Sequence, residues 1–544
     1  MSQSPHARAT PRTFPLPAAA ALVAALAAGC AGEPYDIVLS GGEIYDGSGG
    51  EPRTADLGIR GDRIAALGDL SGADAGIRVD VSGLAVAPGF VDIHSHAVRG
   101  VLRHPLAENY LHQGVTTALG GPDGGSPLPI GAWLDAFEAE GSAINMGLTV
   151  GHGTVRREVL GLEDRAPTDE ELDAMRVLVE QAMQDGAFGL STGLKYVPGA
   201  FAETEEVIEL AKVAGRYGGF HVSHMREEGL ELLEAVLETI RIGEEGGLPT
   251  QITHHKVVGA PMWGQSTESL RLVDEAVARG VDVTIDQYPY TASSTGLTIL
   301  FPAWSLEGGG EALAERMADP EARARIREAI AANLRDDRGG GSPDNVVIAR
   351  CEWDRSLEGK SLGDILRERG LESNLDNGAD LALELQAQGG FGGVFHAMHE
   401  DDVRRIMAHP RTMIASDGGV VAPGEGVPHP RNYGTFARVI SLYVREAGLF
   451  SLSEAVRKMG AFPAERMGLE DRGRIAEDWV ADLTVFDPEG VEEHAEFGDP
   501  HHYATGTHHV LVSGEFVLRD GEVTGARPGK ALRLNRQGAA SSEE

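Results

Sequence analysis

Short apolar runs alternate with helix-like segments through the middle of the chain, from about residue 89 to residue 468. Eight runs have the length and composition of buried strands, and amphipathic stretches separate several of them. The eight runs are 90–93, 115–119, 145–150, 187–191, 219–222, 250–253, 281–285 and 413–415. A chain that alternates buried strands with helices builds a parallel sheet, and eight such units form a (β/α)8 barrel. We therefore predict an α/β fold based on a TIM-like barrel over residues 89–468.

Both ends of the chain have a different pattern, in which short strands are broken by glycine. The strand-like segments are 35–40, 43–45, 57–66 and 84–88 at one end and 482–486, 509–513 and 515–519 at the other. Neither set is large enough for a core of its own, so we expect residues 30–88 and 469–544 to pair into one small β-sandwich domain. Residues 301–389 interrupt the barrel pattern with charged helical sequence and a glycine-rich loop, which predicts an insertion before the eighth strand.

The charge balance limits the partners of this chain. The chain has 47 Lys and Arg residues and 83 Asp and Glu residues, which gives a formal net charge of −36. Nucleic-acid binders neutralise phosphates with basic side chains, so this composition excludes most of that class. The expected partner is a small molecule, and the oligomeric state stays open.

The first 29 residues have the three parts of an export signal. Arg8 and Arg12 supply a positive flank, an apolar run covers residues 15–28, and Gly29 precedes Cys30. The run is short for a membrane span, and its end resembles a bacterial lipobox, whose cysteine becomes lipidated. We expect an exported periplasmic or cell-surface lipoprotein held to the membrane only through Cys30. An ordinary cleaved signal and an unprocessed apolar tail are the alternatives.

Metal-ligating side chains follow several of the predicted strands. His94 and His96 follow the first strand at i, i+2 spacing, so both imidazoles can reach one ion. His224 follows the fifth strand, His254 the sixth and Asp417 the eighth. Barrel enzymes place reactive groups at the carboxyl ends of their strands. Four histidines and an acid at one barrel edge indicate a metal site, because such groups rarely cluster without an ion.

Longer strings around these residues resemble the amidohydrolase superfamily, and within it the D-aminoacylases, or N-acyl-D-amino acid deacylases. The strings are Pro88–His96 (PGFVDIHSH), Gly151–Arg156 (GHGTVR), Gly189–Leu194 (GLSTGL), Ser223–Glu227 (SHMRE), Thr253–Lys256 (THHK), Asp286–Tyr290 (DQYPY) and His429–Phe436 (HPRNYGTF). The likeness runs from Tyr35 to about Lys530. It implies zinc-dependent hydrolysis of the amide of N-acyl-D-amino acids, and preference for the D form rests wholly on this resemblance.

The resemblance also implies a binuclear zinc centre. His94, His96 and Asp417 would hold one ion, and His224 and His254 the other. Asp417 would act as general acid/base, because a metal ion lowers the pKa of bound water from about 15.7 toward 7 and a neighbouring carboxylate can then take its proton.

The bridging ligand is the point at which this chain departs from the family. Familiar D-aminoacylases have a cysteine where this sequence has Asp123. Lys195 follows the fourth strand, where other amidohydrolases have a lysine that becomes a carbamate bridge, so we expect a carboxylated Lys195. A bridge made by Asp123 and a site with a single ion are the alternatives.

A free carboxylate on the substrate requires a cationic group in the protein. Arg431 matches the family's carboxylate-binding arginine, and its fork can hold both oxygens. By resemblance, Lys256, Tyr288 and Ser294 would assist. Two other functions remain open: a related amidohydrolase acting on D-dipeptides, cyclic amides or lactones, and a catalytically idle lipoprotein that binds a ligand.

Overall fold

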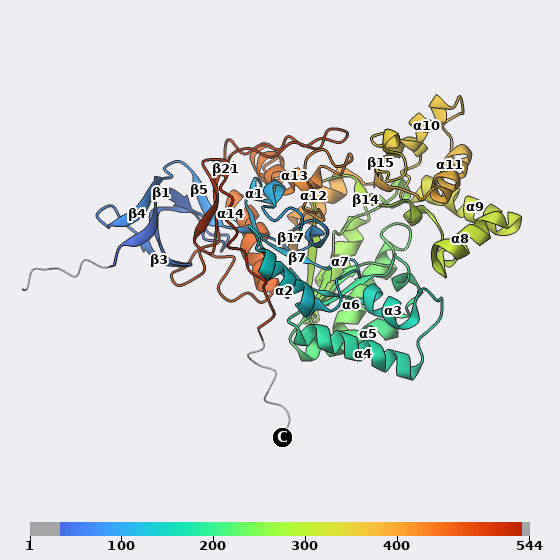
Figure 1. The fold of residues 1–544 in the computed structure, drawn as a ribbon, viewed down its shortest axis with the longest axis horizontal. Helices are drawn as coiled ribbons and strands as arrows, with labels where there is room; N and C mark the ends of the chain where they lie inside the picture. The colour runs from blue at the N-terminus through green and yellow to red at the C-terminus, as the bar shows by residue number, and fades with distance from the viewer. Residues whose placement is uncertain (1–32, 536–544) are drawn as a thin grey trace, which may run out of the picture.

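The computed structural model describes residues 33–535, so the signal segment and Cys30 lie outside the described residues. Strands from the beginning of the chain, β1 to β5, lie at one end of an elongated body (Figure 1), and helices α8 to α11 lie at the other. Over residues 33–535, no helix is both long and apolar enough to cross a membrane.

Two parallel sheets form the centre of the molecule. One has the order β17-β13-β12-β11-β10-β9 and the other the order β6-β7-β8. Their bounds are β6 Phe90–Asp92, β7 Val115–Gly120, β8 Asn145–Leu148, β9 Val150–Gly151, β10 Gly189–Gly193, β11 Phe220–His224, β12 Thr250–Ile252, β13 Val283–Gln287 and β17 Thr412–Ile414. Each of the eight predicted runs overlaps at least one of these strands. The sheets adjoin at both edges, since only Thr149 separates β8 from β9 and the Asp417 amide donates to the His94 carbonyl at 2.9 Å.

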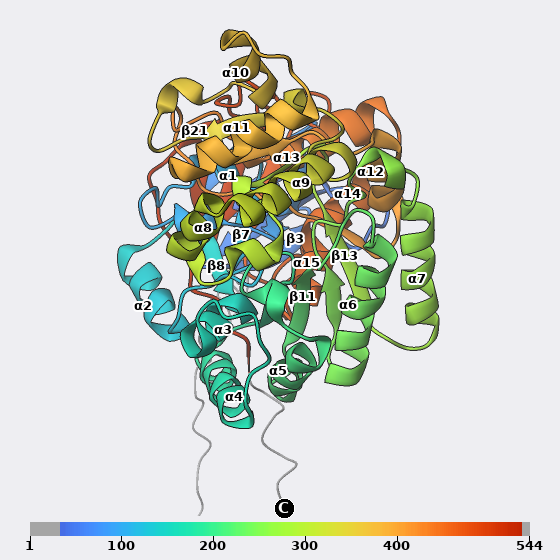
Figure 2. The ribbon, with the colours of Figure 1, turned by 90° about the vertical axis from the view of Figure 1, so that its right-hand side faces the viewer.

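Helices flank these strands, and neighbouring helices pack in chain order from α3 to α7. Figure 2 shows α5, α6 and α7 side by side along the strands. The helices of this part are α1 Glu108–Leu111, α2 Ile130–Glu140, α3 His152–Leu160, α4 Asp169–Gln184, α5 Thr204–Arg216, α6 Leu232–Gly246, α7 Ser266–Ala278, α12 Glu400–Ala408, α13 Arg431–Arg438, α14 Leu452–Val456 and α15 Phe462–Arg466. Thr168 caps α4 through the reciprocal bonds with Glu171 that its Thr-x-x-Glu sequence predicts.

One nine-stranded sheet joins the two ends of the chain. Its order is β21-β20-β19-β18-β5-β1-β2-β3, and β4 pairs with β1. The bounds are β1 Tyr35–Ile44, β2 Arg53–Arg60, β3 Arg63–Gly68, β4 Ala75–Asp80, β5 Ala85–Pro88, β18 Leu483–Phe486, β19 Thr507–Val512, β20 Glu515–Arg519 and β21 Glu522–Val523. The link is the antiparallel pairing of β18 with β5, and buried side chains from both ends, such as Leu39 and Leu483, share one core.

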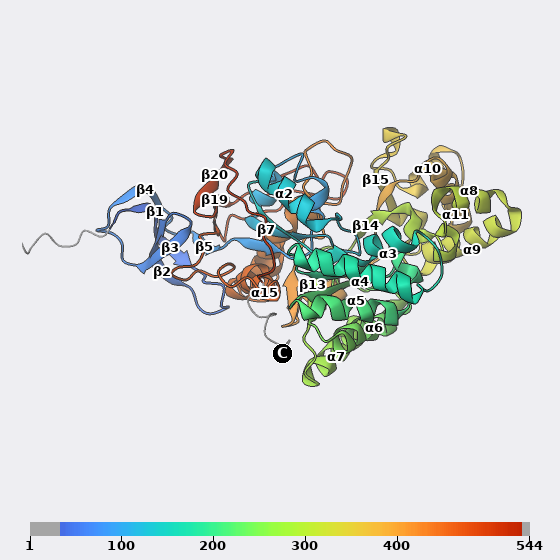
Figure 3. The ribbon, with the colours of Figure 1, turned by 60° about the horizontal axis from the view of Figure 1, so that its bottom comes forward.

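A separate body lies between β13 and β17 in the chain and stands away from the terminal strands (Figure 3). It contains the antiparallel strands β14 Ser293–Gly296, β15 Val346–Arg350 and β16 Gly392–Phe395, with helices α8 Gly309–Ala318, α9 Pro320–Asp336, α10 Leu362–Glu368 and α11 Leu375–Ala387. Its core includes Ile330, Leu334 and Phe395. The body begins before residue 301, with strand β14. The sequence did not reveal this strand, because β14 is polar (SSTG) and has no apolar pattern.

Candidate metal centre

Six side chains meet at the carboxyl edge of the parallel strands. His94 and His96 follow β6, Asp123 follows β7, His224 ends β11, His254 follows β12 and Asp417 follows β17. Carboxyl ends of parallel strands lie at one edge, so residues more than 300 positions apart come together.

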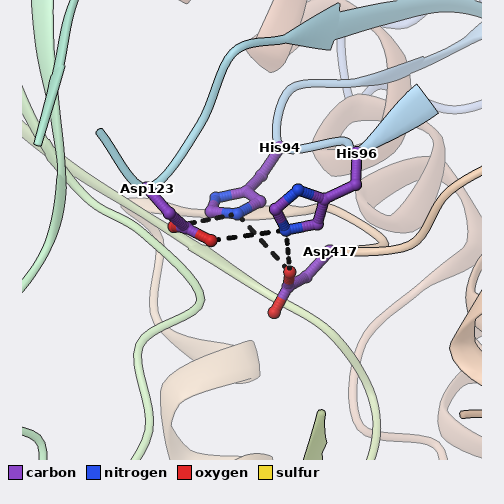
Figure 4. Close-up of side chains that lie close together, drawn as sticks. All are labelled: His94, His96, Asp123 and Asp417. Carbon is purple, nitrogen blue, oxygen red and sulfur yellow. Dashed lines mark hydrogen bonds and ion pairs between the residues drawn. The ribbon is translucent and has the colours of Figure 1, made fainter. Parts of the chain in front are cut away.

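Figure 4 shows the first group, which consists of His94, His96, Asp123 and Asp417. The Nε2 atom of His94 lies 3.4 Å from Asp123 Oδ1 and 3.6 Å from Asp417 Oδ1. The Nε2 atom of His96 lies 3.3 Å from Asp123 Oδ2 and 3.1 Å from Asp417 Oδ1. Two imidazole nitrogens and two carboxylates therefore point at one small volume.

The second group consists of Asp123, His224 and His254. Asp123 Oδ1 lies 3.5 Å from His224 Nδ1 and 3.3 Å from His254 Nε2. These two nitrogens are 2.7 Å apart. Asp123 is thus common to both groups, the position that the sequence offered for it as an alternative bridging ligand.

The electrostatics of this cluster fit a bound cation. Both ring nitrogens of His94 and the Nε2 of His224 are buried without a hydrogen-bond partner among the described residues. Burial opposes charge at Asp123, yet His94, His224 and His254 hold the pKa of Asp123 well below its usual range. Burial likewise disfavours a charged His94, but Asp123 and Asp286 raise the pKa of His94 to about 9. Imidazole and carboxylate donors without thiolate suit zinc and the neighbouring divalent metals.

Three of the six residues have left-handed backbone conformations, with φ of 56° at Asp123, 36° at His254 and 49° at Asp417. Such conformations cost of order 1–3 kcal/mol each and concentrate at functional sites. Neighbouring carboxylates maintain two of them: Asp286 accepts the His254 amide at 2.7 Å, and Asp92 accepts the amide of Ser416, next to Asp417, at 2.8 Å.

Lys195, the residue expected to form a carbamate bridge, contacts two carboxylates. Its Nζ contacts Glu227 and lies 3.4 Å from Asp337 Oδ2. Burial favours the neutral amine, but Asp337 and Glu227 raise the pKa of Lys195. A carbamate forms only from a neutral amine, so these two carboxylates favour the ammonium.

The predicted substrate residues lie beside the first group. Arg431 Nη1 donates to Asp417 Oδ2 at 2.7 Å, and its guanidinium lies 4.9 Å from the centre of the Tyr288 ring. Arg431 also reaches the main-chain oxygen of Ser294 at 3.4 Å. Lys256 is buried, with Nζ 2.6 Å from His254 Nδ1. A cavity of about 850 Å³ is lined by Arg431, Ser294, Asp417, His96 and Asp123 together, while Tyr288 and Lys256 lie behind this lining.

Sequence reasoning missed a buried carboxylate that supports the site. Glu228 is fully buried and accepts from Lys256 at 2.5 Å and from Arg338. Its Oε1 also lies 3.1 Å from His254 Nδ1. Arg338 follows α9, so the body between β13 and β17 is fastened to the metal-site side chains. The one sequence signal for this residue is its place directly after Arg226 and Glu227, close to the strand end that carries His224.

Comparison with known proteins decides the family. The amidohydrolase family model matches residues 78–518. A D-aminoacylase of Alcaligenes xylosoxydans xylosoxydans is 40% identical, over 92% of this chain and 98% of that protein. The chain belongs to the D-aminoacylase family of amidohydrolases.

Solved structures of this family share the fold. A D-aminoacylase with a binuclear metal centre is 37% identical, covers 92% of this chain and 100% of its own, and superposes with a TM-score of 0.79. The N-acyl-D-glutamate deacylase of Bordetella bronchiseptica, solved with zinc and a phosphonate mimic of the tetrahedral intermediate, is 34% identical with the same coverage and TM-score. The fold is therefore the α/β amidohydrolase fold of D-aminoacylases.

Proposed function

We propose that this protein hydrolyses the amide bond of N-acyl-D-amino acids, releasing a carboxylate and a D-amino acid, at a zinc centre built from the six clustered residues. The observation that carries the proposal is that Asp123, which two metal-ligand groups share, lines the same cavity as His96, Asp417 and the guanidinium of Arg431. Metal ligands supply hydrolytic chemistry, and the arginine supplies recognition of a carboxylate. The D-aminoacylase relatives supply the reaction and its handedness.

Zinc would be held by His94, His96 and Asp417 on one side of Asp123 and by His224 and His254 on the other. Bound zinc acidifies water and polarises a carbonyl oxygen. Asp417 is the proton carrier of the site: it takes a proton from the attacking water and returns it to the departing amine nitrogen. Burial opposes its charge, but Arg431 and His96 lower the pKa of Asp417, so the carboxylate is ionised at neutral pH.

Arg431 orients the substrate through its carboxylate. Its planar fork matches two carboxylate oxygens, and Tyr288 packs under the guanidinium and restricts its position. Lys256 adds a second positive charge behind the cavity, and Ser294 contributes a wall and an acceptor for Arg431.

Amine release from N-acetyl-D-leucine and N-acetyl-L-leucine tests this function. Chelator-treated enzyme should be inactive, and added Zn²⁺ should restore hydrolysis of the D substrate with little hydrolysis of the L substrate. Asp417→Asn should stay at least about 100-fold below the wild-type rate after the same addition. Equal rates for both enantiomers, or activity that survives complete metal removal, would contradict the proposal.

For the shared ligand we propose Asp123 rather than a carboxylated Lys195. Its two oxygens face the two groups, whereas the Lys195 ammonium contacts Glu227 and Asp337. Metal analysis of purified protein discriminates the two. Asp123→Ala should lose bound metal relative to wild type, and Lys195→Ala should keep the wild-type amount. The reverse pattern would restore the carbamate bridge.

We also propose that β6, β7, β8 with β9, β10, β11, β12, β13 and β17 together form a closed barrel. Support comes from the parallel order of the two sheets and from backbone bonds between the chain after β17 and the chain after β6. In one of these bonds the His96 backbone amide donates to the Gly418 carbonyl at 2.6 Å. An experimental structure with continuous strand pairing around all eight positions would establish it, and an open edge between β17 and β6 would contradict it.

Export and lipidation of Cys30 are the proposed route to the membrane. The support is the sequence alone: a positive flank, an apolar run and a cysteine after Gly29. In a bacterial host fed labelled fatty acid, the wild-type chain should incorporate label and sediment with membranes. Cys30→Ser should do neither. Membrane association of Cys30→Ser equal to wild type would contradict the anchor.

A further inference from the structure

Besides Arg350 and Arg431, three arginines line the cavity. Arg99 ends the short 3₁₀ helix Ala97–Arg99 just after His96, Arg103 follows one turn later, and Arg157 lies on α3. All three are exposed, and all three line the cavity that contains Asp417 and Arg431. We refer to Arg99, Arg103 and Arg157 as the arginine group.

The arginine group has no carboxylate counter-ion in the described part of the chain. Over residues 33–535, no carboxylate oxygen lies within 4.0 Å of a nitrogen of these guanidiniums. The one bond from their side chains joins Arg103 Nη2 to the main-chain oxygen of Arg99 at 3.2 Å. Arg350 lines the same cavity but differs, because its Nε lies 2.7 Å from Glu352 Oε1.

The acidic side chains of the cavity do not balance the arginine group. Asp123 and Asp417 contact the site histidines, Asp417 also contacts Arg431, and Glu425 lies 3.7 Å from His104 Nε2. The bond from Arg103 to the Arg99 carbonyl brings the guanidinium of Arg103 to the backbone of Arg99, and the like charges of these two residues repel. An anion between them would relieve that repulsion. In a chain with a net charge of −36, a positive cavity wall indicates an anionic ligand.

We propose that the arginine group binds a second carboxylate of the substrate, so that the preferred substrates are N-acyl-D-amino acids with two carboxylates. This inference rests on the proposed deacylase function, in which Arg431 binds the first carboxylate. Guanidiniums bind carboxylates through paired hydrogen bonds. The second carboxylate belongs either to the amino-acid side chain or to the acyl group, and these two sources are distinguishable with matched substrates.

The test compares each acidic substrate with a neutral counterpart of similar size. N-acetyl-D-glutamate is paired with N-acetyl-D-glutamine, and N-succinyl-D-leucine with N-butanoyl-D-leucine. In zinc-loaded wild type, kcat/KM should favour the acidic member of one pair at least tenfold, and that pair identifies the source. The ratio of kcat/KM for the acidic substrate to kcat/KM for the neutral substrate should fall about tenfold in the double variant Arg99→Gln/Arg103→Gln. It should fall by a similar factor in the single variant Arg157→Gln, because charge-assisted hydrogen bonds are of that strength. Arg350→Gln is the control and should keep the wild-type ratio.

Salt dependence tests the proposal without any variant. The kcat/KM of the acidic substrate should fall more steeply with ionic strength than that of its neutral counterpart. Ratios at or below one in wild type, ratios unchanged in the folded variants, or equal salt slopes would overturn the role of the arginine group. Hydrolysis of none of the four amides would contradict the deacylase function itself.

Discussion

Replacing the buried Glu228 by glutamine should destabilise the protein more than the same replacement at a solvent-exposed glutamate. Glu228 is fully buried between two buried cations, Lys256 and Arg338. Glutamine keeps the size but removes the negative charge, so Lys256 and Arg338 both lose the carboxylate that they contact. Removing one partner of a buried ion pair costs about 3–5 kcal/mol. We expect a loss of that size in the free energy of unfolding, measured by urea titration of the protein with fluorescence detection.

A matched control is the adjacent Glu227. Its side chain is 20% exposed, and its partner Lys195 retains Asp337 as a second carboxylate. Glu227→Gln should therefore cost only about 1 kcal/mol. Adding Lys256→Met to Glu228→Gln should recover at least about 1 kcal/mol, because contacting charges couple. Equal losses for Glu227→Gln and Glu228→Gln, or no recovery in the double variant, would refute the role assigned to the buried charges.

Three further predictions concern single side chains. Asp417→Asn should lower kcat by at least about 100-fold, because general acid–base catalysis contributes that much, with KM nearer to wild type; a variant within tenfold of the wild-type kcat would contradict it. Asp123→Cys loaded with Co²⁺ should show a near-ultraviolet thiolate-to-metal band that Asp123→Ala lacks; identical spectra would place residue 123 outside the centre. Burial lowers the pKa of Lys458 to about 8 from 10.5. Between these two pH values the unfolded chain keeps the Lys458 proton and the folded chain has released it. The free energy of unfolding should therefore rise from about pH 8 to about pH 10.5. The rise attributable to Lys458 is at most about 3 kcal/mol. Lys458→Met should lack that contribution, and parallel pH curves for the two proteins would refute it.

Strand positions were predictable because their signal is local. Apolar runs such as 281–285 are flanked by turn residues, and a histidine placed just after a strand has a fixed position at the sheet edge. The same reasoning brought His224 and His254 together correctly, since parallel strands align their carboxyl ends. Asp123 was foreseen only as an alternative.

What failed to emerge from the sequence depends on contacts between distant segments. Lys195 contacts Glu227 and Asp337, which lie 32 and 142 positions later, and no local pattern reports such partners. Glu228 and Arg338 meet across 110 positions for the same reason. The polar strand β14 has no hydrophobic alternation, so the body after β13 could not be delimited from its sequence.

An anomalous diffraction map at the zinc edge, from crystals of zinc-loaded protein, tests the metal centre most directly. Peaks should lie within bonding distance of Asp123, one beside His94, His96 and Asp417 and one beside His224 and His254 if both sites are filled. Lys195 should remain an unmodified lysine beside Glu227. Zinc bridged by a carbamate on Lys195, or bound without Asp123, would contradict the account.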